Sequence, residues 1–330
     1  MKEKLLSVKD LRTYYKTRFG DKIVAVDGVS LDLEEGKVLG IAGESGCGKS
    51  TLALSLIGLF SMPLCHDSGS ISIYGKDITK LDKETRRVEV LGKKIAYIPQ
   101  AAMNALNPTC KIKNFIFDIM REHHPHMTKE EVYALSKERF NDLNLEARVL
   151  ESYPNELSGG MKQRTVIAIS TIMNPDILVA DEPTSALDVS TQKVVMKMLK
   201  SLMEKGIVKS MIFITHELPL LYHIADEIMV MYAGECVERG TSDEVVFEPL
   251  HPYAVELMTS IVVPEIGQKH HKLSSIPGAP PNLKYKIQGC RFADRCKYVN
   301  SQCRMMSIPL KSLGHRTYRC LLDREVEDVG

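Results

Sequence analysis

Residues 43–50 read GESGCGKS and lie between a short apolar run at residues 38–42 and an apolar helical run at residues 52–59. Glycines at these spacings let consecutive backbone N–H groups turn inward on an anion, and the start of the following helix adds its positive end. The pattern therefore predicts a phosphate-binding loop that joins a strand to a helix. This strand–loop–helix unit is the strongest local constraint on the fold.

The order of apolar runs and helical stretches in the rest of the chain predicts an α/β fold. Short apolar runs at residues 95–98, 177–180, 211–215 and 228–231 are interspersed with helical stretches at 165–173 and 190–204. Such alternation predicts a mainly parallel sheet covered on both faces. Runs at 5–8, 23–26 and 29–33, separated by the turn residues Gly20-Asp21 and Asp27-Gly28, predict an antiparallel β flank.

Two regions interrupt this pattern. Between about residues 101 and 165 the strand signal vanishes, and residues 113–121 and 129–143 are expected to be helical, which predicts a helical subdomain. From about residue 249 the chain becomes rich in prolines and turns, which predicts a loop-rich extension over 249–330 with little regular structure.

Composition excludes some function classes. The net charge of +1 gives no reason to expect a nucleic-acid partner. No stretch approaches the roughly 18 apolar residues of a membrane helix, and the charged N-terminus does not resemble a secretory signal. A cytoplasmic location is the expectation.

The phosphate loop has a chemistry for each residue type. Lys49 is expected to bridge the β- and γ-phosphates, and the Ser50 hydroxyl to take one position around Mg²⁺. The nucleotide is expected to contact the loop and the residue after it, that is Gly43, Glu44, Ser45, Gly46, Cys47, Gly48, Lys49, Ser50 and Thr51.

Further short sequences follow in a fixed order. Residues 157–164 read LSGGMKQR, Asp181 and Glu182 end an apolar run, residues 185–188 read SALD, His216 follows another apolar run, and Gln100 follows AYIP. Together they resemble the nucleotide-binding domain of ABC transporters, whose signature is usually written LSGGQ. The resemblance covers most of residues 5–240 and implies a P-loop NTPase fold, with residues 1–248 as the ATPase domain. Met161 departs from the signature glutamine and resembles a variant found in peptide importers.

The resemblance implies roles for four residues around the γ-phosphate. Asp181 would hold Mg²⁺ through water, and Glu182 would act as the general base or orient the attacking water. His216 would contact the γ-phosphate, and Gln100 would sense Mg²⁺ and the attacking water. No residue needed for hydrolysis is missing, which argues against a regulatory ATP-binding protein without turnover.

The resemblance also implies that two such domains act together. Ser158, Gly159 and Gly160 would present a helix N-terminus to ATP bound by an opposite subunit, and Asp188 belongs to the loop beside it. Tyr15 falls where the family places an aromatic ring against adenine, and Tyr14 is the competing choice.

Three phrases narrow the branch of the family. Residues 100–108 (QAAMNALNP), 248–253 (EPLHPY) and 276–281 (IPGAPP) resemble the ATPases of oligopeptide and dipeptide importers. Relatives with the same extension carry oligosaccharides or nickel, so these substrates remain alternatives.

The resemblance also implies partners at the cytoplasmic face of the membrane. They are a second ATPase (a paralogue in a heterodimer), two transmembrane permease subunits and, indirectly, a solute-binding protein. A soluble ABC ATPase acting on DNA or ribosomes is the rival; the paired cassettes or long coiled coils usual there do not occur in this sequence.

Four of the eight cysteines crowd into the extension, in the order Cys290-x5-Cys296-x6-Cys303-x16-Cys320. In a reducing cytosol this suggests a metal site or cluster before disulfides. The set resembles one that binds a [4Fe–4S] cluster in some family members, and the absence of close Cys pairs is unlike structural zinc. A cluster, zinc and free or paired thiols remain open, and a structural staple is the simplest role. The expected cofactors are ATP, Mg²⁺ and this cluster.

Overall fold

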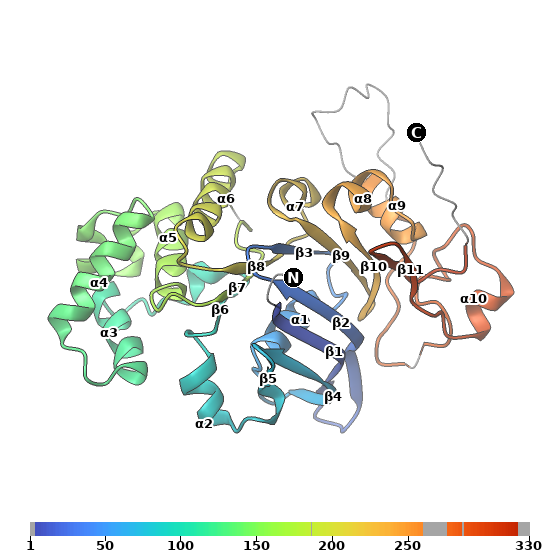
Figure 1. The fold of residues 1–330 in the computed structure, drawn as a ribbon, viewed down its shortest axis with the longest axis horizontal. Coiled ribbons are helices and arrows are strands. Elements are labelled where there is room, and N and C mark those ends of the chain that lie inside the picture. Colours follow the sequence, from blue (N-terminus) through green and yellow to red (C-terminus); the bar gives the residue numbers. More distant parts are fainter. Residues whose placement is uncertain (1–3, 186, 260–275, 286, 323–330) are drawn as a thin grey trace. The chain divides into compact units, whose positions relative to one another are not determined.

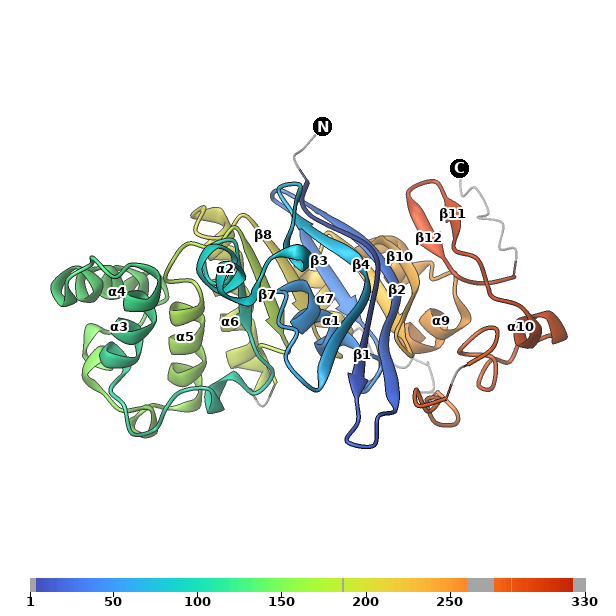
Figure 2. The same cartoon turned by 90° about the horizontal axis from the view of Figure 1, so that it is seen from below.

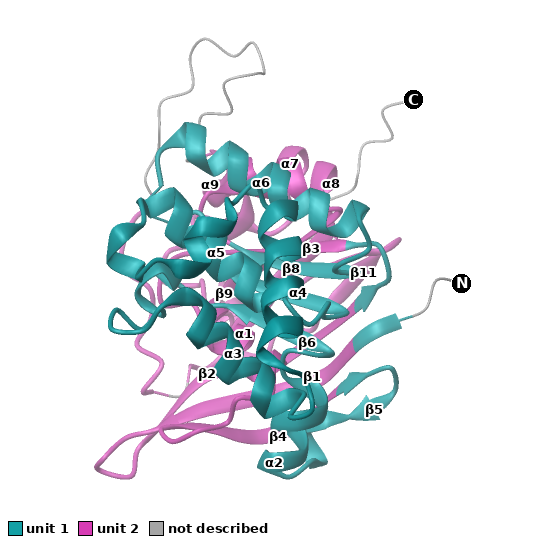
Figure 3. Cartoon of the chain, turned by 90° about the vertical axis from the view of Figure 1, so that its left-hand side faces the viewer, with its two compact units in different colours: residues 1–6, 33–37, 72–214 teal, residues 7–32, 38–71, 215–330 magenta. Residues whose placement is uncertain are grey.

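The computed structural model describes residues 4–185, 187–259, 276–285 and 287–322. The chain divides into two compact units (Figure 3): unit 1 comprises residues 1–6, 33–37 and 72–214, and unit 2 comprises 7–32, 38–71 and 215–330. The domain boundary that the sequence predicts near residue 249 lies inside unit 2 and stays a prediction. None of the described helices has the length and apolar character needed to cross a membrane.

Unit 1 is built on three parallel strands, in the order β6 (Ile95–Ile98), β7 (Ile177–Asp181) and β8 (Ser210–Ile214) (Figure 1). Every residue of β7 and β8 is buried. The unbroken apolar runs follow from this burial, since a strand covered on both faces has no solvent side to alternate with. The long helix α6 (Val189–Glu204) separates β7 from β8 along the chain.

The predicted helical subdomain is confirmed in unit 1. Helix α3 (Ile112–His123) packs against α4 (Lys129–Asp142), and α4 contacts α5 (Gly159–Ser170) (Figure 2). Helix α4 begins with a capping box, in which Thr128 accepts from the N–H of Glu131 while the Glu131 carboxylate accepts from the N–H of Thr128. Unit 1 also holds the short elements β5 (Lys76–Asp77), α2 (Lys83–Thr85) and a π-helical turn over Arg86–Val90.

Unit 2 carries a mixed sheet. Strand β3 (Val38–Ala42) pairs parallel with β9 (Glu227–Tyr232), and β9 pairs antiparallel with β10 (Glu235–Thr241). Helix α1 (Lys49–Leu56) follows β3, and α7 (Leu218–Ile224) packs on β3. Helices α8 (Ser242–Phe247) and α9 (Pro252–Thr259) continue the chain after β10.

The predicted β flank is present, but its strands are longer than expected. Strands β1 (Lys4–Lys16), β2 (Lys22–Glu34) and β4 (Leu64–Ile73) lie in the order β2-β1-β4, with β1 and β2 joined by a tight turn (Figure 2). The predicted turn at Asp27-Gly28 is wrong, because β2 runs through both residues. Gly28 has a positive φ of 68° within the strand, and the N–H of Asp27 donates to the carbonyl of Gly234 at 2.8 Å.

The C-terminal extension is more regular than the sequence predicts. Strand β12 (Arg316–Tyr318) pairs with β10, β11 (Lys311–Leu313) pairs with β12, and α10 (Ser301–Met305) precedes them. The fully buried carboxylate of Glu238 on β10 accepts from the N–H groups of Leu250 (2.9 Å) and His251 (2.7 Å) and from Arg316 Nη2 (3.2 Å). Burial raises the pKa of Glu238, and these donors oppose that shift.

Replacing Arg316 by Met should therefore destabilise unit 2, because it leaves the buried Glu238 carboxylate without its cationic partner. We expect a loss of roughly 3 kcal/mol or more. Lys113→Met is the matched control, since Lys113 and Glu151 form an exposed pair worth at most about 1 kcal/mol. Thermal unfolding of both variants checks this, and equal melting temperatures would contradict it.

Candidate functional site

The phosphate loop in unit 2 depends on two glycines. Gly43 (φ 148°) and Gly48 (φ 105°) both have backbone conformations that side chains rarely adopt. A Cβ on Gly43 would lie 2.3 Å from the carbonyl oxygen of Met231, and one on Gly48 would lie 2.2 Å from that of Ala25. No other residue fits at either position without moving a neighbouring strand.

Lys49 begins α1 and points back into the loop. Its Nζ donates to the carbonyl oxygens of Gly43 at 2.6 Å and Glu44 at 3.0 Å, and the side chain is nearly buried. The loop thus closes around a cation, the arrangement expected of a site for a β- or γ-phosphate. Ser50 and Thr51 follow in the first turn of α1, where their backbone N–H groups have no partner inside the helix.

The two candidate adenine residues have different surroundings. The hydroxyl of Tyr15 is 3.1 Å from the hydroxyl of Thr51, so Tyr15 lies beside the start of α1. Tyr14 instead lines a pocket with Arg12 and Lys22, and Lys22 Nζ sits 4.4 Å from the centre of its ring. The hydrogen bond to α1 favours Tyr15 over Tyr14.

Unit 1 brings together the residues at the end of β7. Asp181 is fully buried, and the Tyr97 hydroxyl donates to its Oδ2 at 3.2 Å. Glu182 adopts a positive φ of 48°, which a non-glycine residue rarely does, while its N–H donates to Ile214 at 2.8 Å. Gln100 Nε2 donates to Glu182 Oε2 at 3.0 Å. The structure therefore joins Gln100 to Glu182, which are distant in sequence.

The signature residues form an open helix N-terminus. Ser158 caps α5 by accepting from the N–H of Met161 at 3.3 Å, and Ser158 and Gly159 are exposed, with Gly160 half-buried. Further along α5, the buried Gln163 donates to the carbonyl of Pro183 at 2.5 Å. This bond ties the signature helix to the segment after Glu182.

Asp188 caps α6 in the same unit. Its carboxylate accepts from the N–H of Thr191 at 3.0 Å and from the hydroxyls of Ser190 and Thr191. These donors, the Ser190 hydroxyl first, lower the pKa of Asp188, so the cap is charged at neutral pH. Ala186, in the same predicted loop, lies outside the described residues.

His216 is exposed, in the turn between β8 and α7. The structure adds four residues that contact the predicted ones or the segment beside them: Tyr97, Gln163, Tyr253 and Arg295. Gln163, Tyr97 and Tyr253 stand inside the LSGGMKQR, AYIP and EPLHPY runs, which are usable signals. Arg295 has no such signal, because its partner Glu44 is remote in sequence.

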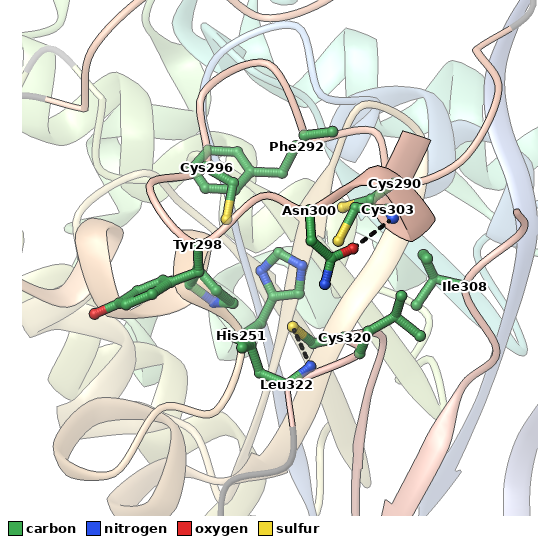
Figure 4. Close-up of a pocket in the computed structure, with 13 residues that line it drawn as sticks. His251, Cys290, Phe292, Cys296, Tyr298, Asn300, Cys303, Ile308, Cys320 and Leu322 are labelled. Carbon is green, nitrogen blue, oxygen red and sulfur yellow. Dashed lines mark hydrogen bonds between the residues drawn. The ribbon is translucent and has the colours of Figure 1, made fainter. Parts of the chain in front are cut away.

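The four cysteines of the extension line one pocket in unit 2, with His251 and Phe292 beside them (Figure 4). Burial, followed by the closeness of the other three thiols, raises the pKa of Cys290 to about 12. Burial also raises the pKa of Cys296. Across the described residues, no group of three or more His, Cys, Asp or Glu side chains is arranged to hold a metal ion. The predicted metal site is therefore not supported beyond the shared pocket.

Comparisons with known proteins agree with these features. Residues 26–185 match the family described as ABC transporter, and residues 237–303 match the family described as oligopeptide/dipeptide transporter, C-terminal region. The dipeptide transport ATP-binding protein DppD of Caldanaerobacter subterraneus subsp. tengcongensis is 39% identical over 302 residues, 91% of each chain. The oligopeptide transport ATP-binding protein OppD of Bacillus subtilis is 40% identical over 301 residues, covering 90% of this chain and 82% of OppD.

A comparison with a solved structure agrees with the fold described above. The dimeric structure of MJ0796, described as a bacterial ABC transporter cassette, superposes with a TM-score of 0.61 at 28% identity. The match covers 72% of this chain and 98% of MJ0796. The α/β fold with a helical subdomain, predicted from the phosphate loop and its companions, is confirmed. The chain belongs to the ABC transporter family, among the ATP-binding subunits of its oligopeptide and dipeptide transporters.

Proposed function

We propose that the chain hydrolyses Mg·ATP to energise the import of dipeptides or oligopeptides through membrane permease subunits. The observation that carries the proposal is the closed phosphate loop with Lys49 at its centre, in a chain that also holds the Gln100–Glu182 pair. Family membership supports ATP hydrolysis, and the matching C-terminal region supports the peptide substrate over the oligosaccharide and nickel alternatives.

In the proposed mechanism the phosphate loop binds the nucleotide, and the residues at the end of β7 supply groups for its hydrolysis. Lys49 would hold the β- and γ-phosphates, and Ser50 and Asp181 would hold Mg²⁺, which when bound supplies positive charge to the phosphate oxygens. Glu182 accepts a proton from the attacking water or orients it, and Gln100 holds the Glu182 carboxylate in place. His216 contacts the γ-phosphate.

The assembly is proposed to contain two ATPase subunits. The exposed N-terminus of α5 presents the unpaired N–H groups and positive end of a helix, which suit a phosphate held by another subunit. The relative MJ0796 was solved as a dimer, including a post-hydrolysis state with ADP and Pi. We propose a heterodimer with a paralogous ATPase, bound peripherally to two permease subunits at the cytoplasmic face and served by a solute-binding protein.

The function predicts that Glu182→Gln lowers ATP turnover by about 10²- to 10⁴-fold, because glutamine cannot accept the proton of the attacking water. Nucleotide binding should survive, since the phosphate loop is unchanged. ATPase rates and nucleotide titrations of the assembled transporter measure both. Lys49→Ala is the comparison and should weaken binding itself. Near-normal turnover in an assembled Glu182→Gln complex would overturn the assignment.

For the adenine site, Tyr15→Ala should weaken Mg·ATP binding by about 1–3 kcal/mol, the usual loss of one aromatic stacking partner for a base. Tyr14→Ala is the matched control and should change binding little. Titration with ATP and with inorganic triphosphate separates the two effects, because only ATP carries the base. If Tyr14→Ala gives the larger loss for ATP, the assignment is reversed.

A second proposal concerns the extension: we propose that Cys290, Cys296, Cys303 and Cys320 bind one [4Fe–4S] cluster. Its support is the single pocket shared by four thiols, a donor set typical of such clusters (Figure 4). Zinc, which four thiolates can also hold at about 2.3 Å, is the alternative occupant of this pocket. When bound, the cluster would serve as a structural staple.

Anaerobically purified protein should then be brown, with about four irons per chain, as the cluster formula requires. Cys296→Ser should bleach the colour and expose the extension to protease, and Cys65→Ser, outside the pocket, should do neither. Iron analysis and absorption spectra decide the matter. Colourless protein carrying one zinc per chain, or no metal at all, would rule out the cluster.

A further inference from the structure

Arg295 is a direct link between the extension and the phosphate loop. Arg295, between Cys290 and Cys296 in the chain, makes a forked ion pair with Glu44, the second residue of the loop. Arg295 Nη1 lies 2.6 Å from Glu44 Oε2, and Nη2 lies 2.9 Å from Oε1. The Arg295 side chain is 4% exposed and that of Glu44 25%, so solvent screens the pair only in part. Forked, partly buried pairs of this kind are strong and directional.

The backbone of Glu44 is held by the same part of the chain. Its N–H donates to the hydroxyl of Tyr253 at 2.8 Å. The ring of Tyr253 packs against Phe292, with centroids 5.4 Å apart, and Phe292 lines the four-cysteine pocket. Glu44 is thus fixed at both its side chain and its backbone by residues that pack on or beside that pocket.

A second arginine supports the same region. Arg291 donates to the carbonyl oxygen of Ala233 and pairs with Asp27. The N–H of the next residue, Gly234, donates to the carbonyl of Cys47 in the phosphate loop at 2.8 Å. Both arginines of the Cys290–Cys296 segment therefore act on the loop or on the turn that supports it.

Because Glu44 carries a negative charge, its ion pair with Arg295 affects nucleotide binding. A carboxylate in a phosphate loop opposes the approach of a triphosphate, and it does so more strongly where solvent is partly excluded. The Arg295 guanidinium neutralises this carboxylate and fixes its position through two hydrogen bonds. The hydrogen bonds that Arg295 donates to the Glu44 carboxylate raise the pKa of Arg295, so the guanidinium stays charged throughout the physiological range.

We propose that Arg295 is a positioning residue for ATP: it holds and neutralises Glu44, and so makes nucleotide affinity depend on the folded four-cysteine segment. The inference rests on the proposed role of the phosphate loop in ATP binding. It gives the extension a regulatory function, in which any change that unfolds the cysteine pocket weakens ATP binding without altering the residues that perform hydrolysis.

The test is a double-mutant cycle on the full chain, measured by titration with the non-hydrolysed analogue Mg·AMP-PNP. Arg295→Met should raise the Kd about tenfold or more, the loss expected for a charged hydrogen-bonded pair. Glu44→Gln in that background should recover most of the affinity, because it removes the unpaired carboxylate. Arg304→Met is the matched control, since Arg304 pairs with Asp294 on the exposed surface of the same segment. If the two substitutions simply add, the proposal is overturned.

The dependence on the cysteine pocket is tested with Cys303→Ser, which alters the pocket without touching the loop. It should raise the Kd in the otherwise unchanged protein but not further in the Arg295→Met variant. Cys303→Ser with unchanged affinity, or with the same added loss in both backgrounds, contradicts the coupling. Lys49→Ala distinguishes a failure of the proposed nucleotide site from a failure of the proposed coupling. If it binds the analogue normally, the proposed nucleotide site is wrong; if it loses binding while Arg295→Met does not, only the inference fails.

Discussion

A phosphate loop binds an anion only when several consecutive N–H groups point toward one place, and a chain of L-residues does not adopt that curve unaided. Gly43 and Gly48 supply it here, at two positions where any side chain would collide with the carbonyl of a neighbouring strand. This close approach also constrains the positions of the elements around the loop, which are strands β3 and β9 and helix α1. The loop donates a hydrogen bond to Tyr253 and accepts bonds from Arg295 and Gly234, while Lys49 donates to the loop carbonyls.

The end of β7, which we propose takes part in catalysis, depends on a different constraint, because it places a carboxylate in a buried position. Asp181 is fully buried with the Tyr97 hydroxyl on its carboxylate, and Glu182 is turned by a left-handed backbone toward Gln100. Such a backbone costs energy and persists only where neighbours determine it. The bond from the Glu182 N–H to β8 and the bond from Gln163 to Pro183 provide that support.

The C-terminal extension shows how a loop-rich segment can be built around buried charge. Glu238 on β10 gathers donors from Leu250, His251 and Arg316, so one carboxylate joins the core strand, the segment before α9 and strand β12. The aromatic cluster of Tyr232, Tyr253 and Phe292 adds apolar packing between β9, α9 and the cysteine segment. A segment with few long apolar runs thereby acquires order from a small number of specific contacts.

The sequence by itself determined what depends on neighbouring residues: the phosphate loop, the buried strands β3, β6 and β7, helices α3, α4 and α6, and the order of the family's short sequences. These are visible because burial sets unbroken apolar runs and loop chemistry sets residue types at fixed spacings. Only the tertiary structure decided that β2 continues through Asp27-Gly28, that β12 joins β10, and that Gln100 meets Glu182 and Arg295 meets Glu44. The reason is physical: each of these is a hydrogen bond or ion pair between residues far apart in the chain. No local pattern of propensity or hydrophobicity encodes which distant partner a polar side chain will find.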